Sequence, residues 1–217
     1  MSRERLFQIF IRNLGEATAS ERVPRDRIEK YRGILPPALL KIWEEEGWCS
    51  YADGLMWTVD PNEYSHLAGM WLQGTPFETL DRYHIIARSA FGDLYVWGER
   101  TGWRITIGCP AGQIFALADK VATPVEDPDI AVLSFFAGLK RHLFDFRDDA
   151  EQFLFQRARE SLGALNKNEM YGFEPALSLG GRAVLENLRK VNLDVHLTLL
   201  REFSAPAVPP MKMGSDS

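Results

Sequence analysis

The sequence predicts an α+β protein, in which an antiparallel sheet with flanking helices precedes a mainly helical part packed on it. Short segments rich in β-branched and aromatic residues, separated by turn residues, fill the middle of the chain. Helical periodicity dominates after residue 128, and a polar, Pro-containing break at 123–128 separates the two patterns. The expected domains are residues 1–127 and 128–204, and residues 205–217 are expected to form a flexible tail.

Helices are expected on the N-terminal side of the sheet at residues 3–14, 24–33 and 36–47. The first has apolar residues at helical spacing, and the other two begin at prolines and end at glycines, which suit these positions. The third helix ends in the acidic run 44–46, where the helix dipole disfavours negative charge. This run is therefore expected either to be solvated or to serve a partner.

Five strands are expected, at residues 54–59, 83–88, 94–97, 103–107 and 113–117. A short helix from Asp60 to Leu72 follows the first strand, and Gly- and Pro-containing turns separate the others. Strands of this length and spacing predict an antiparallel meander.

The C-terminal part is expected to hold helices at residues 130–144, 148–162, 182–190 and 194–203. Asp148 and Asp149 suit the start of the second of these helices, because the helix dipole favours acids there. The Gly-rich stretch 163–181 is expected to be an irregular loop, and long loops in compact domains are often functional.

The composition is that of an ordinary globular protein: of 217 residues, 46% are hydrophobic and 25% are charged. No apolar run approaches the ~20 residues of a membrane span, and no export signal is recognisable. With only Cys49 and Cys109, a disulfide scaffold is not expected. The sequence therefore predicts a reduced, cytoplasmic protein that does not bind membranes.

Charge is unevenly distributed along the chain. The net charge is −5 overall, +3 over residues 1–32, −7 over 33–128 and −1 over 129–217. An acidic middle segment is unsuited to binding phosphate backbones directly, so no direct nucleic-acid binding is expected. Such a segment can steer a basic partner toward the protein, or simply keep the surface solvated.

No pattern for catalysis or metal binding stands out. None of the four histidines has another metal ligand at a recognised spacing, and no nucleophile-elbow or phosphate-binding motif is present. Cys49 has no identifiable base partner, and the Gly180-Gly181 pair is weak evidence for an anion site. We expect no catalytic residue, no metal and no cofactor.

Two segments, 48–64 and 165–181, concentrate aromatic and acidic residues. The first, with the acidic run before it, is a candidate acid-plus-aromatic surface for a partner: Glu44, Glu45, Glu46, Trp48, Tyr51 and Asp53. Both segments together provide a candidate pocket between the two parts: Trp57, Tyr64, Glu169, Tyr171, Phe173 and Glu174. The alternative is that the aromatic residues belong to the core and that Asp60 caps a helix.

Residues 31–64 (YRGILPPALLKIWEEEGWCSYADGLMWTVDPNEY) resemble the opening of the GAD-like domain, and residues 84–99 resemble its following strand–turn–strand. Residues 162–181 (LGALNKNEMYGFEPALSLGG) resemble the signature of the domain usually joined to the GAD-like one. The resemblance spans roughly residues 23–203. The opening is also loosely similar to the Smi1/Knr4-like immunity superfamily.

The joined pair is typical of immunity proteins of type VI secretion systems, including antidotes to DNase effectors. The resemblance therefore implies a bacterial, non-enzymatic inhibitor that binds a cognate toxin. A nuclease must bind phosphates, so its active face is usually basic, and a basic nuclease is the expected partner. The competing hypothesis is a small-molecule-binding sensory or regulatory module with a pocket between the halves. Neither hypothesis defines the oligomeric state.

Overall fold

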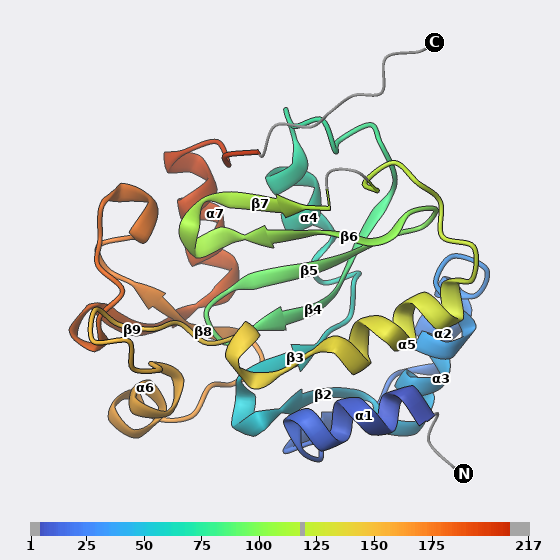
Figure 1. Cartoon of the computed structure of the whole chain (residues 1–217), viewed down its shortest axis with the longest axis horizontal. Helices are drawn as coiled ribbons and strands as arrows, with labels where there is room; N and C mark the ends of the chain where they lie inside the picture. The colour runs from blue at the N-terminus through green and yellow to red at the C-terminus, as the bar shows by residue number, and fades with distance from the viewer. Residues whose placement is uncertain (1–4, 118–119, 209–217) are drawn as a thin grey trace.

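The computed structural model describes residues 5–117 and 120–208, and its centre is a seven-stranded antiparallel sheet with strands in sequence order (Figure 1). The strands are β1 (Ala19–Glu21), β2 (Trp48–Tyr51), β3 (Met56–Thr58), β4 (Tyr83–Ser89), β5 (Asp93–Gly98), β6 (Gly102–Gly108) and β7 (Gln113–Ala116). This order confirms the predicted meander, and the five expected strands all form within a few residues of their predicted bounds.

Strands β1 and β2 were not expected from the sequence. All three residues of β1 are exposed, and a short polar edge strand has no hydrophobic alternation to reveal it. Strand β2 is buried on both faces for most of its length and lacks alternation for that reason. The two strands pair in antiparallel register, with Glu21 opposite Trp48.

Seven α-helices surround the sheet within the described residues (Figure 1): α1 (Arg5–Leu14), α2 (Arg25–Tyr31), α3 (Pro37–Glu46), α4 (Ser65–Leu72), α5 (Pro128–Gly138), α6 (Phe155–Leu162) and α7 (Leu193–Phe203). Alternation along β5 divides the core between the two faces of the sheet. Tyr95 and Trp97 pack with the cluster that contains α1, α3 and α5, whereas Leu94 and Val96 pack with the cluster that contains α4 and α7.

The C-terminal part contains a two-stranded sheet of β8 (Glu169–Phe173) and β9 (Leu188–Asn192), which corrects two expectations. Residues 182–190 are not a helix, and the loop 163–181 contains a strand. In β8, Met170 faces one core cluster while Tyr171 and Phe173 face the other. Burial on both faces removes the alternation by which a strand is recognised.

Two predicted C-terminal helices are shorter than expected. Helix α6 begins at Phe155, because Asp148 instead forms a turn in which its carboxylate accepts hydrogen bonds from the amides of Ala150 and Gln152. An ion pair from Asp148 to Arg157 joins this turn to α6. Helix α5 ends at Gly138 and is followed by a 3-10 turn.

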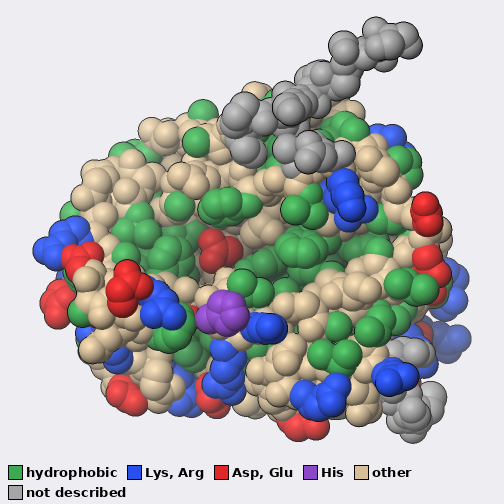
Figure 2. All heavy atoms as spheres, in the orientation of Figure 1, with side chains coloured by type: hydrophobic (Ala, Val, Ile, Leu, Met, Phe, Trp, Pro, Cys, Tyr) green, Lys and Arg blue, Asp and Glu red, His purple; other side chains and the backbone are tan. Residues whose placement is uncertain are grey.

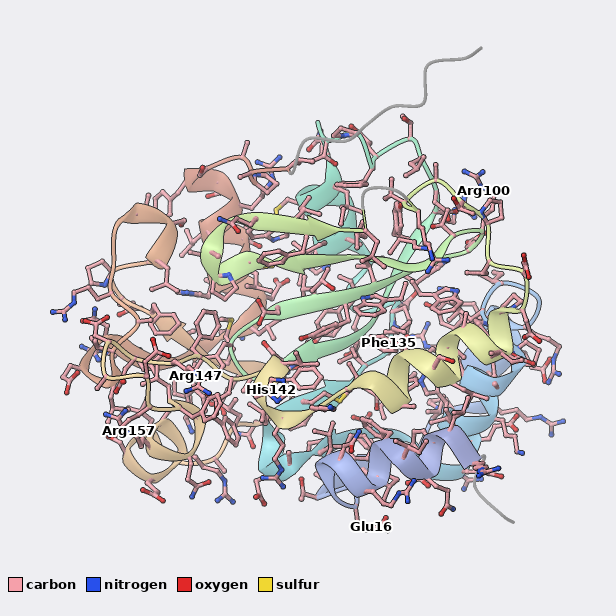
Figure 3. The ribbon with its side chains drawn as sticks, in the orientation of Figure 1. Glu16, Arg100, Phe135, His142, Arg147 and Arg157 are labelled. Atoms are coloured by element: carbon pink, nitrogen blue, oxygen red, sulfur yellow. The ribbon has the colours of Figure 1, made fainter. Side chains whose placement is uncertain are left out.

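Both parts of the chain contribute to the core cluster on the α1, α3 and α5 side of the sheet. Phe135 of α5 lies against the sheet (Figure 3), and its ring centre is 4.9 Å from that of Trp103 in β6. The same cluster contains Phe10 of α1 and Tyr171 of β8. The division of the chain into domains at residue 127 stays a prediction from the sequence pattern.

The first residues of the expected tail are attached to the sheet edge. The amide of Ile114 donates a hydrogen bond to the carbonyl of Ala207, and the amide of Ala207 donates to the carbonyl of Gly112. Residues 209–217 of that tail lie outside the described residues. Figure 2 shows hydrophobic side chains along a hollow over the sheet between β7 and α5. No helix among the described residues is long and apolar enough to cross a bilayer.

Candidate functional site

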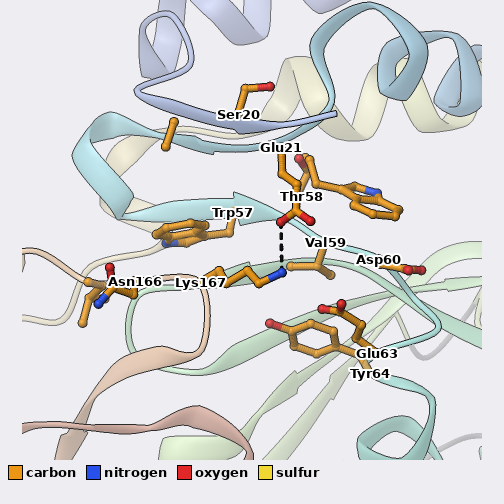
Figure 4. Close-up of a pocket in the computed structure, with 13 residues that line it drawn as sticks. Ser20, Glu21, Trp57, Thr58, Val59, Asp60, Glu63, Tyr64, Asn166 and Lys167 are labelled. Carbon is orange, nitrogen blue, oxygen red and sulfur yellow. Dashed lines mark hydrogen bonds and ion pairs between the residues drawn. The ribbon is translucent and has the colours of Figure 1, made fainter. Parts of the chain in front are cut away.

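A cavity of about 270 Å³ lies where the N-terminal sheet meets the loop before β8 (Figure 4). Its walls come from β1, β2, β3, the turn before α4, and residues 165–167 of the C-terminal part. The lining side chains divide into three aromatic, four charged and several small or apolar residues: Ala19, Ser20, Glu21, Trp48, Trp57, Thr58, Val59, Asp60, Glu63, Tyr64, Leu165, Asn166 and Lys167.

The aromatic walls are held rigidly by the fold. Trp57 Nε1 donates a hydrogen bond of 2.8 Å to the carbonyl of Gly54 in the preceding turn. Tyr64 is 7% exposed and precedes α4, so its ring packs with the α4 cluster while its side chain lines the cavity. Trp48 is partly buried and comes from β2, directly beside β1. These positions follow from the pairing of β1, β2 and β3.

Arg88 of β4 lies behind this wall and is completely buried. It stands opposite Trp57 in the β3–β4 register, and its guanidinium carbon is 4.7 Å from the centre of the Trp57 ring. Burial lowers the pKa of Arg88, and a hydrogen bond to the Tyr64 hydroxyl opposes this effect. Arg88 thereby links two of the aromatic residues that line the cavity.

Arg88 also fixes the loop that closes the cavity from the C-terminal side. Its Nη2 donates a hydrogen bond of 2.9 Å to the carbonyl of Lys167, and its Nη1 donates one of 3.2 Å to the carbonyl of Ser89. Among the described residues, Arg88 Nε has no hydrogen-bond partner. One buried cation therefore joins β4, the turn before α4 and the loop before β8.

Four charged side chains stand around the cavity. Lys167 Nζ lies 3.0 Å from Glu21 Oε2, which joins the loop to β1 (Figure 4). Asp60 is buried, and its Oδ2 lies 3.2 Å from Arg27 Nε of α2. Glu63 is exposed, and none of the described basic residues forms an ion pair with it. Three carboxylates and one ammonium thus line the same space.

The structure brings together only part of the predicted pocket. Trp57 and Tyr64 line the cavity, whereas Tyr171 and Phe173 are buried in the core and do not line it. Glu169 Oε2 lies 3.6 Å from Lys190 Nζ on the neighbouring strand, and Glu174 is exposed. Neither glutamate lines the cavity. Tyr171 and Phe173 are thus corrected to core residues, because both are buried on the face of β8 that packs with the α1, α3 and α5 cluster.

The predicted partner surface is also divided. Glu44 and Glu45 are exposed at the end of α3, and Glu46 is half-buried there. Asp53 is exposed as well, but it follows the opposite end of β2. Tyr51 is fully buried, and its ring centre is 4.7 Å from that of Phe10, so it is corrected to a core residue.

The acids of α3 do not stand alone. Glu44 lines a surface hollow together with Arg22, Arg25 and Arg32. The pKa of Arg32 is raised mainly by its hydrogen bond with Glu29, and the charge of Glu44 adds to this. Basic residues of the N-terminal segment therefore partly offset the acidic run.

Sequence reasoning missed Glu21, Arg88 and Lys167. The available signal was an arginine within the apolar strand around Ile85–Ala90, because a charged residue in a buried strand needs compensating partners. Glu21 and Lys167 are ordinary surface charges in the sequence, and only the chain's fold places them opposite each other.

The other candidate groups are engaged inside the protein. Cys49 and Cys109 are buried thiols that form no disulfide with each other, and burial raises the pKa of Cys109 well above its usual range. The described residues contain no group of three or more side chains suited to hold a metal ion. The amides of Gly180 and Gly181 donate to carbonyls of the same turn, and the next element along the chain is a 3-10 turn, Leu185–Asn187, in place of the expected helix.

Comparisons with known proteins match nearly the whole chain. The model of the GAD-like domain matches residues 5–111, and that of the C-terminal domain of the T6SS (type VI secretion system) immunity protein Tdi1 matches residues 130–204. A comparison with curated proteins gives no match. The structure is similar to the crystal structure of Atu4351 from Agrobacterium tumefaciens, with a TM-score of 0.81 and 21% identity, covering 93% of this chain and 91% of that one. That likeness shows a shared fold.

Proposed function

The chain joins a GAD-like domain to the C-terminal domain of the T6SS immunity protein Tdi1, and from this we propose that it is an immunity protein. It would bind and neutralise a cognate toxin inside the bacterial cell that produces both proteins. The C-terminal match carries this proposal, because that domain is described as part of an immunity protein. Membership of this family supports an immunity role in type VI secretion and a role other than catalysis.

The toxin is proposed to be a nuclease with a basic active face. Enzymes that bind phosphate backbones concentrate Lys and Arg at their sites. The segment 33–128 of this chain carries a net charge of −7, which supports attraction of such a face. Direct binding that covers the nuclease site is the simplest mode of inhibition, and it requires neither nucleic acid nor membrane as a partner.

The proposed contact surface includes Glu44, Glu45, Glu46, Trp48 and Asp53. Glu44, Glu45 and Asp53 are exposed, and Trp48 is partly buried, so their side chains are available to a partner. Aromatic residues beside acids provide an anchor and a polar rim. Tyr51 is not included, because its side chain is in the core.

The experiment has two stages. Tagged protein is first used to capture partners from the cell that encodes it, at low and high salt. The captured candidate is then expressed in a naive host with and without this chain. Immunity predicts a stoichiometric complex, and it predicts that a host expressing the toxin survives only when this chain is expressed with it. A toxic partner whose effect this chain does not suppress would contradict the proposal.

The cavity between the sheet and the loop before β8 supports a second candidate function, the binding of a small molecule. A small-molecule-binding module would place its ligand there, between Trp48, Trp57 and Tyr64. Native mass spectrometry of protein purified without denaturation separates the two functions. A bound small molecule retained at one equivalent favours the sensor, and mass equal to the bare chain favours the immunity protein.

A further inference from the structure

The cavity already holds one cation, which belongs to the protein itself. The ammonium of Lys167 lies 3.0 Å from Glu21, and Figure 4 shows it on the side of the cavity toward Glu63 and Tyr64. The pKa of Lys167 is raised by its hydrogen bond to Glu21 and by the charge of Glu63. The rim of the cavity therefore favours a positive charge at this position.

The contact that holds Lys167 there is easily broken. Its side chain and that of Glu21 are 51% and 55% exposed, and an exposed ion pair is worth about 0–1 kcal/mol. The backbone of Lys167 is held separately, because its carbonyl accepts a hydrogen bond from the buried guanidinium of Arg88. The ammonium can therefore leave without movement of the loop.

Size and charge define what can replace it. A volume of about 270 Å³ lies near the lower end of the ~300–1,000 Å³ of ordinary small-molecule sites, and the space is large enough for a Lys or Arg side chain. Asp60 is already paired with Arg27, so two lining carboxylates, Glu21 and Glu63, stand against the single ammonium of Lys167, and this balance disfavours an anion. Arg88 already lies against Trp57, so the carboxylates supply the attraction and the rings enclose the apolar stem of the guest.

We propose that this cavity receives a Lys or Arg side chain of the partner toxin, which displaces Lys167 from Glu21 and takes its place beside Glu63. This inference rests on the proposed immunity function and adds the anchor by which the toxin is held. The occupant is a protein side chain because β1, all of whose residues are exposed, forms one rim of the cavity and is open to a large partner. The loop before β8 brings the second domain into the same contact.

The test measures the affinity of the captured toxin for four forms of the full chain by calorimetry. Loss of both carboxylates in E21Q/E63Q is expected to weaken binding by roughly tenfold or more, as for charges at the centre of an interface. Removal of the resident ammonium in K167A is expected to strengthen binding by up to about fivefold, since at most ~1 kcal/mol opposes its departure. E160Q/E202Q removes two exposed acids of α6 and α7 and is expected to bind as wild type.

Opposite effects of E21Q/E63Q and K167A distinguish displacement from a purely structural role, which would weaken binding in both. Wild-type affinity in E21Q/E63Q, or weaker binding in K167A, overturns the cavity proposal and leaves the immunity function intact. Failure of wild-type protein to bind any toxin overturns the function itself. A small molecule found in the cavity by native mass spectrometry, and released by E21Q/E63Q, would overturn the choice of a protein side chain.

Discussion

The guanidinium of Arg88 stacks on the ring of Trp57, with 4.7 Å between the guanidinium carbon and the ring centre. It donates hydrogen bonds to the carbonyls of Ser89 and Lys167, and the Tyr64 hydroxyl opposes the lowering of its pKa by burial; all three of these groups are neutral. A buried cation with only neutral partners keeps much of its desolvation penalty. Arg88 thus ties together the cavity wall at a cost to stability.

This arrangement predicts that R88K is less stable than R88M. Lysine keeps the charge buried but cannot reproduce the planar fork, so we expect a loss of about 3 kcal/mol in unfolding free energy. Methionine also loses the hydrogen bonds, but it removes the desolvation penalty, so a change below about 2 kcal/mol is expected. Urea unfolding of the three proteins measures both values.

The same pair of variants reports on the loop. Both are expected to increase amide hydrogen exchange at residues 166–168, because the carbonyl of Lys167 loses its buried donor. An R88K protein at least as stable as R88M would contradict this account of the buried charge.

Asp93 at the start of β5 predicts a pH dependence of stability. Burial raises the pKa of its carboxyl to about 6, although the hydroxyl of Ser89 donates a hydrogen bond that lowers it. Between about pH 4 and 6 the folded state therefore binds more protons than the unfolded state. The contribution of Asp93 to the unfolding free energy is thus complete below pH 4 and falls as the pH rises through 6, by up to about 3 kcal/mol.

D93N is the matched comparison, because it keeps the shape of the side chain and removes the titration. Urea unfolding of both proteins from pH 4 to 8 is expected to show a difference that grows in favour of D93N as the pH rises. A difference that is constant over this range would show that Asp93 titrates as it does in the unfolded chain.

The meander could be predicted from the sequence because β4 to β7 are bounded by clear turns, such as the one at Gly92. The elements that were missed share a physical cause. Alternation identifies a strand only when one face is buried, and β2 and β8 are buried on both faces. The segment 188–192 pairs with β8 as a strand, a tertiary contact that local periodicity does not contain.

The sequence predicted only the part of the candidate site whose residues lie close together along the chain. Trp57 and Tyr64 stood out because aromatic residues were concentrated in one segment, and both line the cavity. The opposite side is formed by Lys167, which lies 146 residues from its partner Glu21 in the sequence. Pairing across such a separation depends on how β1 and the C-terminal loop pack, which one sequence does not reveal.

Gly47 provides a test of how β1 is held. It has a φ of 88°, and a Cβ atom there would lie 2.5 Å from the carbonyl oxygen of Glu21. We expect G47A to displace β1 and to lower the unfolding free energy by about 2–4 kcal/mol, combining backbone strain with the clash. Urea unfolding gives the energy, and hydrogen exchange at residues 19–21 shows whether β1 detaches.

G33A is the control, because Gly33 also has a positive φ of 77° but an added Cβ would meet nothing within 4 Å. The unfolding free energy of G33A should fall by only about 1–2 kcal/mol, because backbone strain is the sole cost. Equal losses in the two variants would mean that the contact between Gly47 and β1 contributes little.

The acidic end of α3 provides the test of electrostatic steering. Reversal of charge in E44K/E45K/E46K is expected to weaken the toxin complex by roughly tenfold, mainly through a slower association rate. It should also reduce the salt dependence of association, because fewer opposite charges are brought together. The effect is moderate because Arg22, Arg25 and Arg32 lie around Glu44 and already offset part of its charge. Stopped-flow association at several salt concentrations measures both quantities.

The control is E160K/E186K/E202K, which changes the net charge equally at exposed positions of the C-terminal part. If this control slows association as much as the α3 variant does, net charge and not the end of α3 attracts the toxin; if only the α3 variant is slow, the toxin approaches over α3 and β2, beside the cavity.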